Sequence, residues 1–296
     1  MKLPTKIAQS FKHEASFFKA VPAIVWQFLF LVIPILFLII LSFTKNPAAF
    51  PSFDNLTLEH YAKVINNDYF KIIFRSFWVA LFTASLCLLI GYPLTYYIAL
   101  RKRAWKNFFL FFLILPFVTN LLVLTYAWSF VLDKDGLLNN ALLSLGIMHE
   151  PILMLNSFFA ILLVMFYCYL PFMIMPLFTS LEKFDSTLIE ASRDLGANQS
   201  QTFFKIILPL TMPAIQTGFL LVFVPAFSEF VIPLLVGGDK FMFAGTVISH
   251  LFLIGQDRLA GAAFTLVSST VLCCIVLFFM WCFAKKRNSQ QRRNHG

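Results

Sequence analysis

Residues 190–209 read EASRDLGANQSQTFFKIILP, the longest polar interruption in the C-terminal half of an otherwise apolar sequence. Gly196 is the residue type that ends helices in the left-handed backbone conformation. Asn198 with Gln201 predicts the start of a second helix, which Pro209 is predicted to stop or kink. The stretch therefore predicts two short, well-delimited helices that present a rigid knob to another molecule.

The first of these helices has two faces. Thr187 and Glu190 have the spacing of a capping box, which favours a helix start at this point. Glu190 and Arg193 are spaced to pair on one side. The opposite side is predicted to carry one apolar stripe with small residues at its centre, formed by Leu188, Ala191, Ser192 and Leu195.

The composition indicates a membrane protein. Hydrophobic residues make up 59% of the 296 residues and charged residues only 12%, whereas a soluble domain has roughly half and a quarter. Phenylalanine alone contributes 38 residues. A water-soluble fold of this length has no interior large enough for so many apolar side chains, so the bilayer must be the solvent.

Apolar runs predict a single all-α membrane domain over residues 1–296, with six spanning helices. Each run exceeds the roughly 20 residues that cross the hydrocarbon core as a helix. The predicted spans are residues 21–43, 76–100, 108–132, 157–181, 206–235 and 259–284. Phe241–Ile254 is shorter and contains Gly245 and His250, so we interpret it as an interfacial or re-entrant helix.

The distribution of positive charge predicts the orientation. Of the 23 lysines and arginines, 16 lie in the N-terminal tail, in the loop after the second span, in the loop at 182–209 and in the C-terminal tail. Cytoplasmic segments are the ones enriched in these residues, so both termini and the 182–209 loop are predicted to be cytosolic. This asymmetry also explains the net charge of +9 without a nucleic-acid partner.

Enzymatic and metal sites have little support in the sequence. The pattern GxxxxGK[ST] is absent, so the chain is not expected to bind ATP through a P-loop, and HExxH is absent as well. No cofactor or metal is predicted. The cysteines lack CxxC spacing and fall in apolar spans, where a thiol acts as a small hydrophobic group: Cys87, Cys168, Cys273, Cys274 and Cys282.

Two polar residues at membrane depth are candidate pathway residues. Glu229 lies between Pro225 and Pro233, and an acidic residue in an apolar segment usually marks a site that faces a cavity. The alternative is that Glu229 reaches water at the external end of its span or caps a loop. Asn120 must likewise face protein or water, either as a helix–helix contact or in a pathway.

The loop at 182–209 resembles the pattern E-A-A-x3-G-x9-I-x-L-P of the membrane-spanning permease subunits of bacterial ABC importers. The matching residues are Glu190, Ala191, Gly196, Ile206, Leu208 and Pro209. Ser192 replaces the second alanine, which is a small residue for a small residue. The segments GYPLTYYIA (91–99), ILPFVTNLLVLTYAW (114–128) and VPAFSEFVIPLLVGG (224–238) further resemble the spermidine/putrescine permeases of the first-subunit type.

This resemblance implies a type I ABC importer permease fold in a bacterial inner membrane. It implies a non-catalytic subunit that pairs with a second permease, two ATPase subunits and a periplasmic or extracellular polyamine-binding protein. The 182–209 loop would then be the coupling loop that seats in the ATPase. Ala191, Ser192 and Gly196 would permit close approach, and Glu190 and Arg193 would make charged contacts at the rim.

A polyamine substrate would favour carboxylates and aromatic faces along its pathway. The residues expected there are Glu229, Phe227, Asn120, Tyr126, Trp128 and Tyr97. Related permeases carry iron(III), thiamine or phosphonates, so another small solute is an alternative. A transporter driven by an ion gradient would be expected to have several intramembrane carboxylates, and here only Glu229 qualifies. A membrane scaffold without a transport role is the third alternative.

Overall fold

The computed structural model describes residues 5–45, 55–66, 68–99, 103–185, 187–255 and 257–294. Over these residues the chain is helical, and its only β-type pairing is an isolated bridge between Thr44 and Leu56. The predicted all-α membrane fold is therefore confirmed for the described part of the chain.

Three long helices form the centre of the molecule: α3 (Tyr69–Ala99), α7 (Phe158–Glu182) and α10 (Leu208–Phe227). Small side chains let them approach closely, as is usual between membrane helices. At Gly218 of α10, an added Cβ would lie 2.8 Å from the Met173 sulfur and 3.1 Å from the Met173 carbonyl oxygen. The α7–α10 crossing therefore leaves little room for a larger residue at this position.

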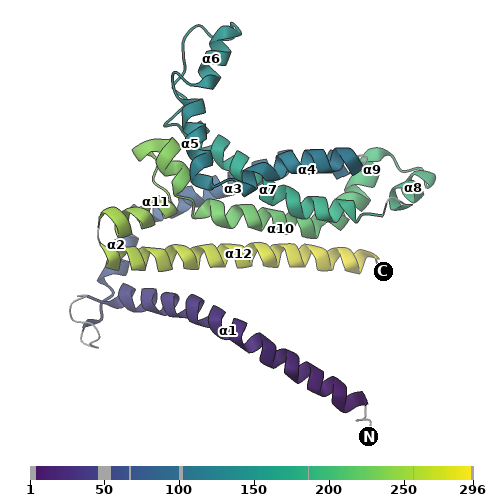
Figure 1. Ribbon diagram of the computed structural model, residues 1–296, viewed down its shortest axis with the longest axis horizontal. Helices are drawn as coiled ribbons and strands as arrows, with labels where there is room; N and C mark the ends of the chain where they lie inside the picture. Colours follow the sequence, from purple (N-terminus) through teal and green to yellow (C-terminus); the bar gives the residue numbers. More distant parts are fainter. Residues whose placement is uncertain are drawn as a thin grey trace.

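Two further helices flank this centre, α1 (Thr5–Phe43) and α12 (Arg258–Asn294). They lie close together where α1 ends and diverge towards the N-terminus (Figure 1). The end of α1 is tied to the short helix α2 (Glu59–Asn66) by a 2.7 Å hydrogen bond between the Ser42 and Tyr61 hydroxyls. Most of the α1 span is exposed, so a lipid or protein surface is needed to cover it.

The predicted third span, residues 108–132, is bent. It consists of α4 (Arg103–Val118) and α5 (Leu121–Leu132), and the apolar segments on the two sides of the break meet at 99°. Asn120 causes a new helix start, because its side-chain oxygen accepts a 2.9 Å hydrogen bond from the Leu122 N–H. The described part thus has five helices that are long and apolar enough to span a membrane, or six if this pair counts as one.

The fifth predicted span, residues 206–235, is corrected at both ends. Helix α9 (Gln199–Thr202), the π-helix η3 (Phe203–Ile207) and α10 are continuous, so Pro209 does not end the helix. A wider turn precedes the proline instead, in which the Leu208 N–H bonds to the Phe203 carbonyl. After Phe227 the helix breaks, and a second π-helix follows as η4 (Pro233–Gly237), then η5 (Gly238–Lys240).

The remaining short helices lie at the two ends of the bundle. Helices α8 (Thr187–Asp194) and α9 lie at the same end as the start of α1 and the end of α12 (Figure 1). At the opposite end lie α2 and α11 (Ala244–Ser249), which continues into η6 (His250–Ile254). This last pair is too short to span, in agreement with the prediction for Phe241–Ile254. Helix α6 (Leu137–Ser144) follows α5.

Candidate functional site

Both ends of helix α8 are fixed by local hydrogen bonds. At its start, the Asp185 carboxylate accepts a 3.0 Å hydrogen bond from the Thr187 N–H, and this bond lowers the pKa of Asp185 below its ordinary value. The cap therefore lies before Thr187, which is already helical, and not at Thr187 as predicted. Because the pKa of Asp185 is lowered, this cap contributes its full stability at pH values above the ordinary carboxyl pKa. The contribution is lost as the pH falls through the lowered pKa.

The C-terminal end of α8 has the predicted glycine stop. Gly196 has a φ of +79°, in the left-handed region that favours glycine. Its N–H bonds to the Arg193 carbonyl at 2.8 Å, and the Ala197 N–H bonds to the Ser192 carbonyl at 3.0 Å. These two bonds form a Schellman motif, which satisfies the last carbonyls of the helix and reverses the chain sharply.

The predicted apolar stripe of α8 is split between two faces. Ser192 is buried, and Ile189 packs against the residues that close the bundle at this end. Leu188 and Leu195 are 43% and 89% exposed, and Ala191 is exposed as well. The reason is that Ile189 and Ser192, three residues apart, occupy the inward face. Two leucines are thereby left on the outer face.

Charged residues accompany the exposed leucines. Glu190 and Arg193 are both exposed on α8. Together with Leu188, Ala191 and Leu195 they give the outer side of α8 an apolar centre with charges beside it. Protein interfaces combine an apolar centre with a polar rim in this way.

Helix α9 fixes α8 to the bundle. The predicted capping box is present: the Gln201 N–H donates to the Asn198 side chain at 2.8 Å, and the Asn198 N–H donates to the Gln201 side chain at 3.0 Å. The hydroxyls of Ser192 and Thr202 are hydrogen-bonded at 2.9 Å, and both residues are buried. The serine in the second small position of the loop therefore supplies a bond that alanine lacks.

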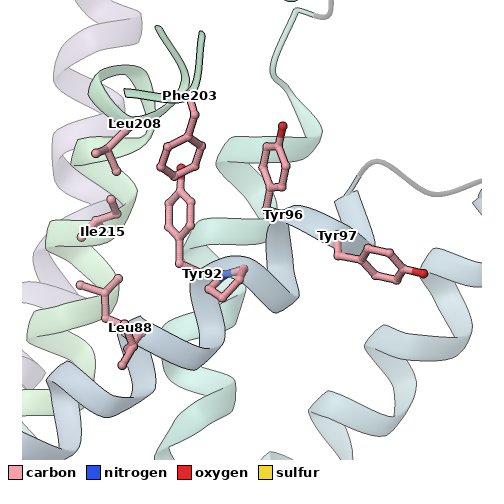
Figure 2. Close-up of a pocket in the computed structure, with 9 residues that line it drawn as sticks. Leu88, Tyr92, Tyr96, Tyr97, Phe203, Leu208 and Ile215 are labelled. Atoms are coloured by element: carbon pink, nitrogen blue, oxygen red, sulfur yellow. The ribbon is translucent and has the colours of Figure 1, made fainter. Parts of the chain in front are cut away.

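A cleft of about 860 Å³ lies between α3 and α10, directly beside the start of η3 (Figure 2). Its walls are aromatic and aliphatic. The lining residues are Leu88, Leu89, Tyr92, Pro93, Tyr96, Tyr97, Phe203, Leu208 and Ile215. Of the predicted pathway residues, this lining contains Tyr97, whose ring points away from the Tyr92 and Phe203 rings (Figure 2).

Glu229 lies in the break between α10 and η4 and is only 7% exposed. Its Oε1 accepts hydrogen bonds from the N–H groups of Phe230 at 3.0 Å, Val231 at 2.8 Å and Ile232 at 3.4 Å. Its Oε2 accepts a hydrogen bond from the Tyr169 hydroxyl on α7. The carboxylate thus caps the start of the second helical segment and joins it to α7, because such N–H groups have no partner inside their own helix.

The other predicted pathway residues lie apart from one another. Phe227 is fully buried in the main core, and Trp128 on α5 packs against Tyr167 of α7 at 5.2 Å between ring centroids. Tyr126 and Asn120 are exposed on α5 and at its start. In the described part of the chain these side chains are therefore distributed between the main core and the surface of α5.

Comparison with known proteins assigns the chain to a family. A profile of the family described as "Binding-protein-dependent transport system inner membrane component" matches residues 88–288. The chain belongs to this family. It is a membrane component of a transport system, and the residues from Gly91 to Gly238 that carry the resemblance fall inside the matched region.

Two curated relatives match most of this transport component, and a solved structure shares its fold. The spermidine/putrescine transport system permease protein PotB of Haemophilus influenzae is 39% identical, covering 81% of this chain and 84% of that protein. PotB of Escherichia coli K12 is 38% identical, covering 90% and 96%. A solved bacterial alginate ABC transporter, in complex with a periplasmic protein bound to an alginate pentasaccharide, has a TM-score of 0.70 at 19% identity, covering 94% and 96%.

Two residues of this transport component had no usable sequence signal. Tyr169 meets Glu229 across 60 residues of sequence, and a tyrosine in an apolar run reads equally well as a core residue. Phe203, which lines the cleft, is one of 38 phenylalanines. Their positions became visible only with the fold.

Proposed function

We propose that this permease subunit imports the polyamines spermidine and putrescine as part of an ATP-driven ABC importer. The observation that supports it is the 38–39% identity, over 81–90% of the chain, to permeases named for spermidine and putrescine transport. The matched segments also cover 84–96% of those relatives, so the similarity extends over most of both proteins.

In the proposed importer this chain forms half of the translocation pathway. A second permease supplies the other half, two ATPase subunits bind on the cytosolic side, and an external binding protein delivers the polyamine. The solved alginate transporter in complex with a periplasmic protein supports the last partner. The exposed span of α1 and the exposed side chains of α5 support a second membrane-spanning partner, because both surfaces are left uncovered by this chain.

Helix α8 is the proposed contact with the ATPase, and ATP hydrolysis is assigned to that partner. Leu188 and Leu195 would bury their exposed side chains in it, and Glu190 and Arg193 would pair at the rim. The fixed ends of α8 support a rigid-body role, because a helix that is capped at both ends transmits a displacement without unwinding. Closure of the ATPase dimer would move α8 and open the pathway outward.

For the pathway, Asn120, Tyr126 and Trp128 of α5 are proposed to face the second permease and the passing cation. Aromatic faces attract ammonium groups at about 0.5–2 kcal/mol each. Phe227 and Glu229 are proposed to hold the broken helix beside this pathway and to keep a carboxylate near it. Tyr97 lies towards the coupling end, near the cytosolic exit in this arrangement.

The orientation gives a direct test. In a chain expressed without its ATPase, whose native cysteines are replaced by alanine, Leu195→Cys is expected to react with a membrane-impermeant maleimide only from the cytosolic side. Leu153→Cys, which is exposed before the start of α7, is expected to react only from outside. Labelling of intact cells and of inside-out vesicles distinguishes the two sides. The reverse pattern would contradict the assignment of α8 to the cytosol.

Transport itself is tested by uptake of labelled putrescine and spermidine. Proteoliposomes contain the complex purified with its ATPase, and the binding protein and ATP are placed on their respective sides. We expect uptake that requires ATP and is reduced by unlabelled polyamine, but not by thiamine or iron(III). If thiamine or iron(III) competes instead, the substrate of this permease belongs to another class. Uptake without the ATPase would contradict an ABC mechanism.

A further inference from the structure

The coupling end of the molecule has its own small hydrophobic cluster. Ile98, Ala99, Phe178, Leu181 and Ile207 form its buried part, and Ile189 of α8 packs against it. The main core, which contains the central parts of α3, α7 and α10, is a separate cluster. Among the residues that the structure describes, Phe203 alone packs against both clusters. Phe203 therefore lies where the coupling end meets the spanning helices.

On one side, Phe203 is joined to α8 through the chain itself. It directly follows Thr202, whose hydroxyl is hydrogen-bonded to that of Ser192 on α8. Ile189 of α8 and the Phe203 ring share the small cluster. Both residues are buried, and each hydroxyl also donates to a backbone carbonyl, Ser192 to that of Ile189 and Thr202 to that of Asn198. A displacement of α8 is therefore expected to move Thr202 and the backbone of Phe203 through this buried contact and through the short connection between α8 and α9.

On the other side, the Phe203 ring contacts α3 edge to face. Its centroid lies 5.7 Å from that of Tyr92 and 6.1 Å from that of Tyr96, at interplanar angles of 86° and 88° (Figure 2). The Tyr92 hydroxyl is in turn hydrogen-bonded to Thr211 of α10 at 2.9 Å. The ring thus contacts the residue that links α3 to α10. Each such aromatic pair adds about 0.5–1.5 kcal/mol beyond burial.

The local backbone and the cleft allow this ring to move. Phe203 begins the π-helix η3, whose wide turn departs from the regular helical ladder and is typical of functional positions. The cleft of about 860 Å³ lies on the open side of the ring. The ring is joined to α8 on one side and packs against two tyrosines of α3 on the other, so it is suited to transmit a displacement from α8 to α3.

We infer that Phe203 is the positioning residue through which movement of α8 reaches α3 and α10. The inference rests on the proposed coupling role of α8. When the ATPase displaces α8, the Ser192–Thr202 bond carries Phe203 with it, and the ring pushes Tyr92 and Tyr96 of α3. Without the ring, α8 still binds and moves, but the spanning helices no longer follow.

The test measures transport per ATP hydrolysed in the intact complex. In proteoliposomes, Phe203→Ala is expected to lower the number of polyamines taken up per ATP at least about fivefold, the lower end of typical couplings between sites. Basal ATP hydrolysis and co-purification of the ATPase are expected to match the unchanged protein. Phe203→Tyr keeps the ring and is expected to restore the ratio. Phe204→Ala serves as the matched control: this 64% exposed neighbour contacts the Phe203 ring at 5.1 Å between centroids, and its removal leaves the contacts of Phe203 with Tyr92 and Tyr96 in place.

Each outcome has a definite meaning. An unchanged ratio in Phe203→Ala, or an equal fall in Phe204→Ala, overturns the role of Phe203. If Phe203→Ala does not assemble, Phe203→Leu retains most of the apolar volume without the ring and is measured instead. The proposed function itself is contradicted if the unchanged protein takes up polyamine without the ATPase or takes up none at all. Those results concern the unchanged protein, so they are distinguishable from a failure of the Phe203 variants alone.

Discussion

Replacing Gly196 by proline is expected to lower ATP-driven uptake at least about tenfold, while the chain still inserts into the membrane. Proline fixes φ near −65°, whereas Gly196 has φ +79°, and proline also removes the N–H that bonds to the Arg193 carbonyl. The Schellman end of α8 cannot form, so the outer face of α8 is no longer presented in one orientation. A loss of about 1.4 kcal/mol in the free energy of productive docking already corresponds to a tenfold loss of uptake.

Gly196→Ala is the matched control for this prediction. A Cβ at Gly196 meets no atom within 4 Å, so alanine adds only the strain of the left-handed conformation, about 1–2 kcal/mol. We expect an intermediate loss of uptake, with full membrane insertion of both variants by fractionation and reduced co-purification of the ATPase. Uptake of the proline variant at the level of the unchanged protein would contradict the coupling role of α8.

The architecture could be predicted from the sequence because the relevant signals are local. A long apolar run becomes a spanning helix regardless of its neighbours, since the bilayer demands internal hydrogen bonding of every backbone group. The end of α8 and the start of α9 were equally predictable, because Gly196 and the Asn198–Gln201 box satisfy helix ends within a few residues. Both features are independent of distant contacts.

Features for which the local pattern allows more than one arrangement were missed. The periodicity of α8 was compatible with a stripe of Leu188, Ala191, Ser192 and Leu195, but the inward face was decided by Ile189 and by the Ser192–Thr202 bond. Pro209 was expected to stop or kink a helix, and a π turn accommodates it instead. The sequence predicts a helix–helix contact or a pathway position for Asn120, and the structure shows that it caps α5 where the third span bends.

Glu229→Ala is expected to destabilise the folded permease measurably. The substitution leaves the buried Ile232 N–H and the Tyr169 hydroxyl without their acceptor. Each buried polar group that loses its partner costs about 1–3 kcal/mol. The start of η4 is then no longer capped, and its bond to α7 is lost. We expect a lower melting temperature in detergent, measured by size-exclusion chromatography after heating.

Glu229→Gln separates this capping from the charge of the side chain. The amide oxygen still accepts from the backbone N–H groups, and the amide nitrogen donates to the Tyr169 oxygen, so most of the stability lost in the alanine variant is expected to return. Polyamine uptake is expected to stay reduced, because a carboxylate at membrane depth attracts cations and an amide does not.

Tyr169→Phe keeps the carboxylate and removes only the hydroxyl bond, so it is expected to lower the melting temperature less than Glu229→Ala. A glutamine variant with normal uptake rates and the normal ranking of putrescine and spermidine would restrict Glu229 to holding the helix break. If the alanine variant has the same melting temperature as the unchanged protein, Glu229 does not hold the helix break either.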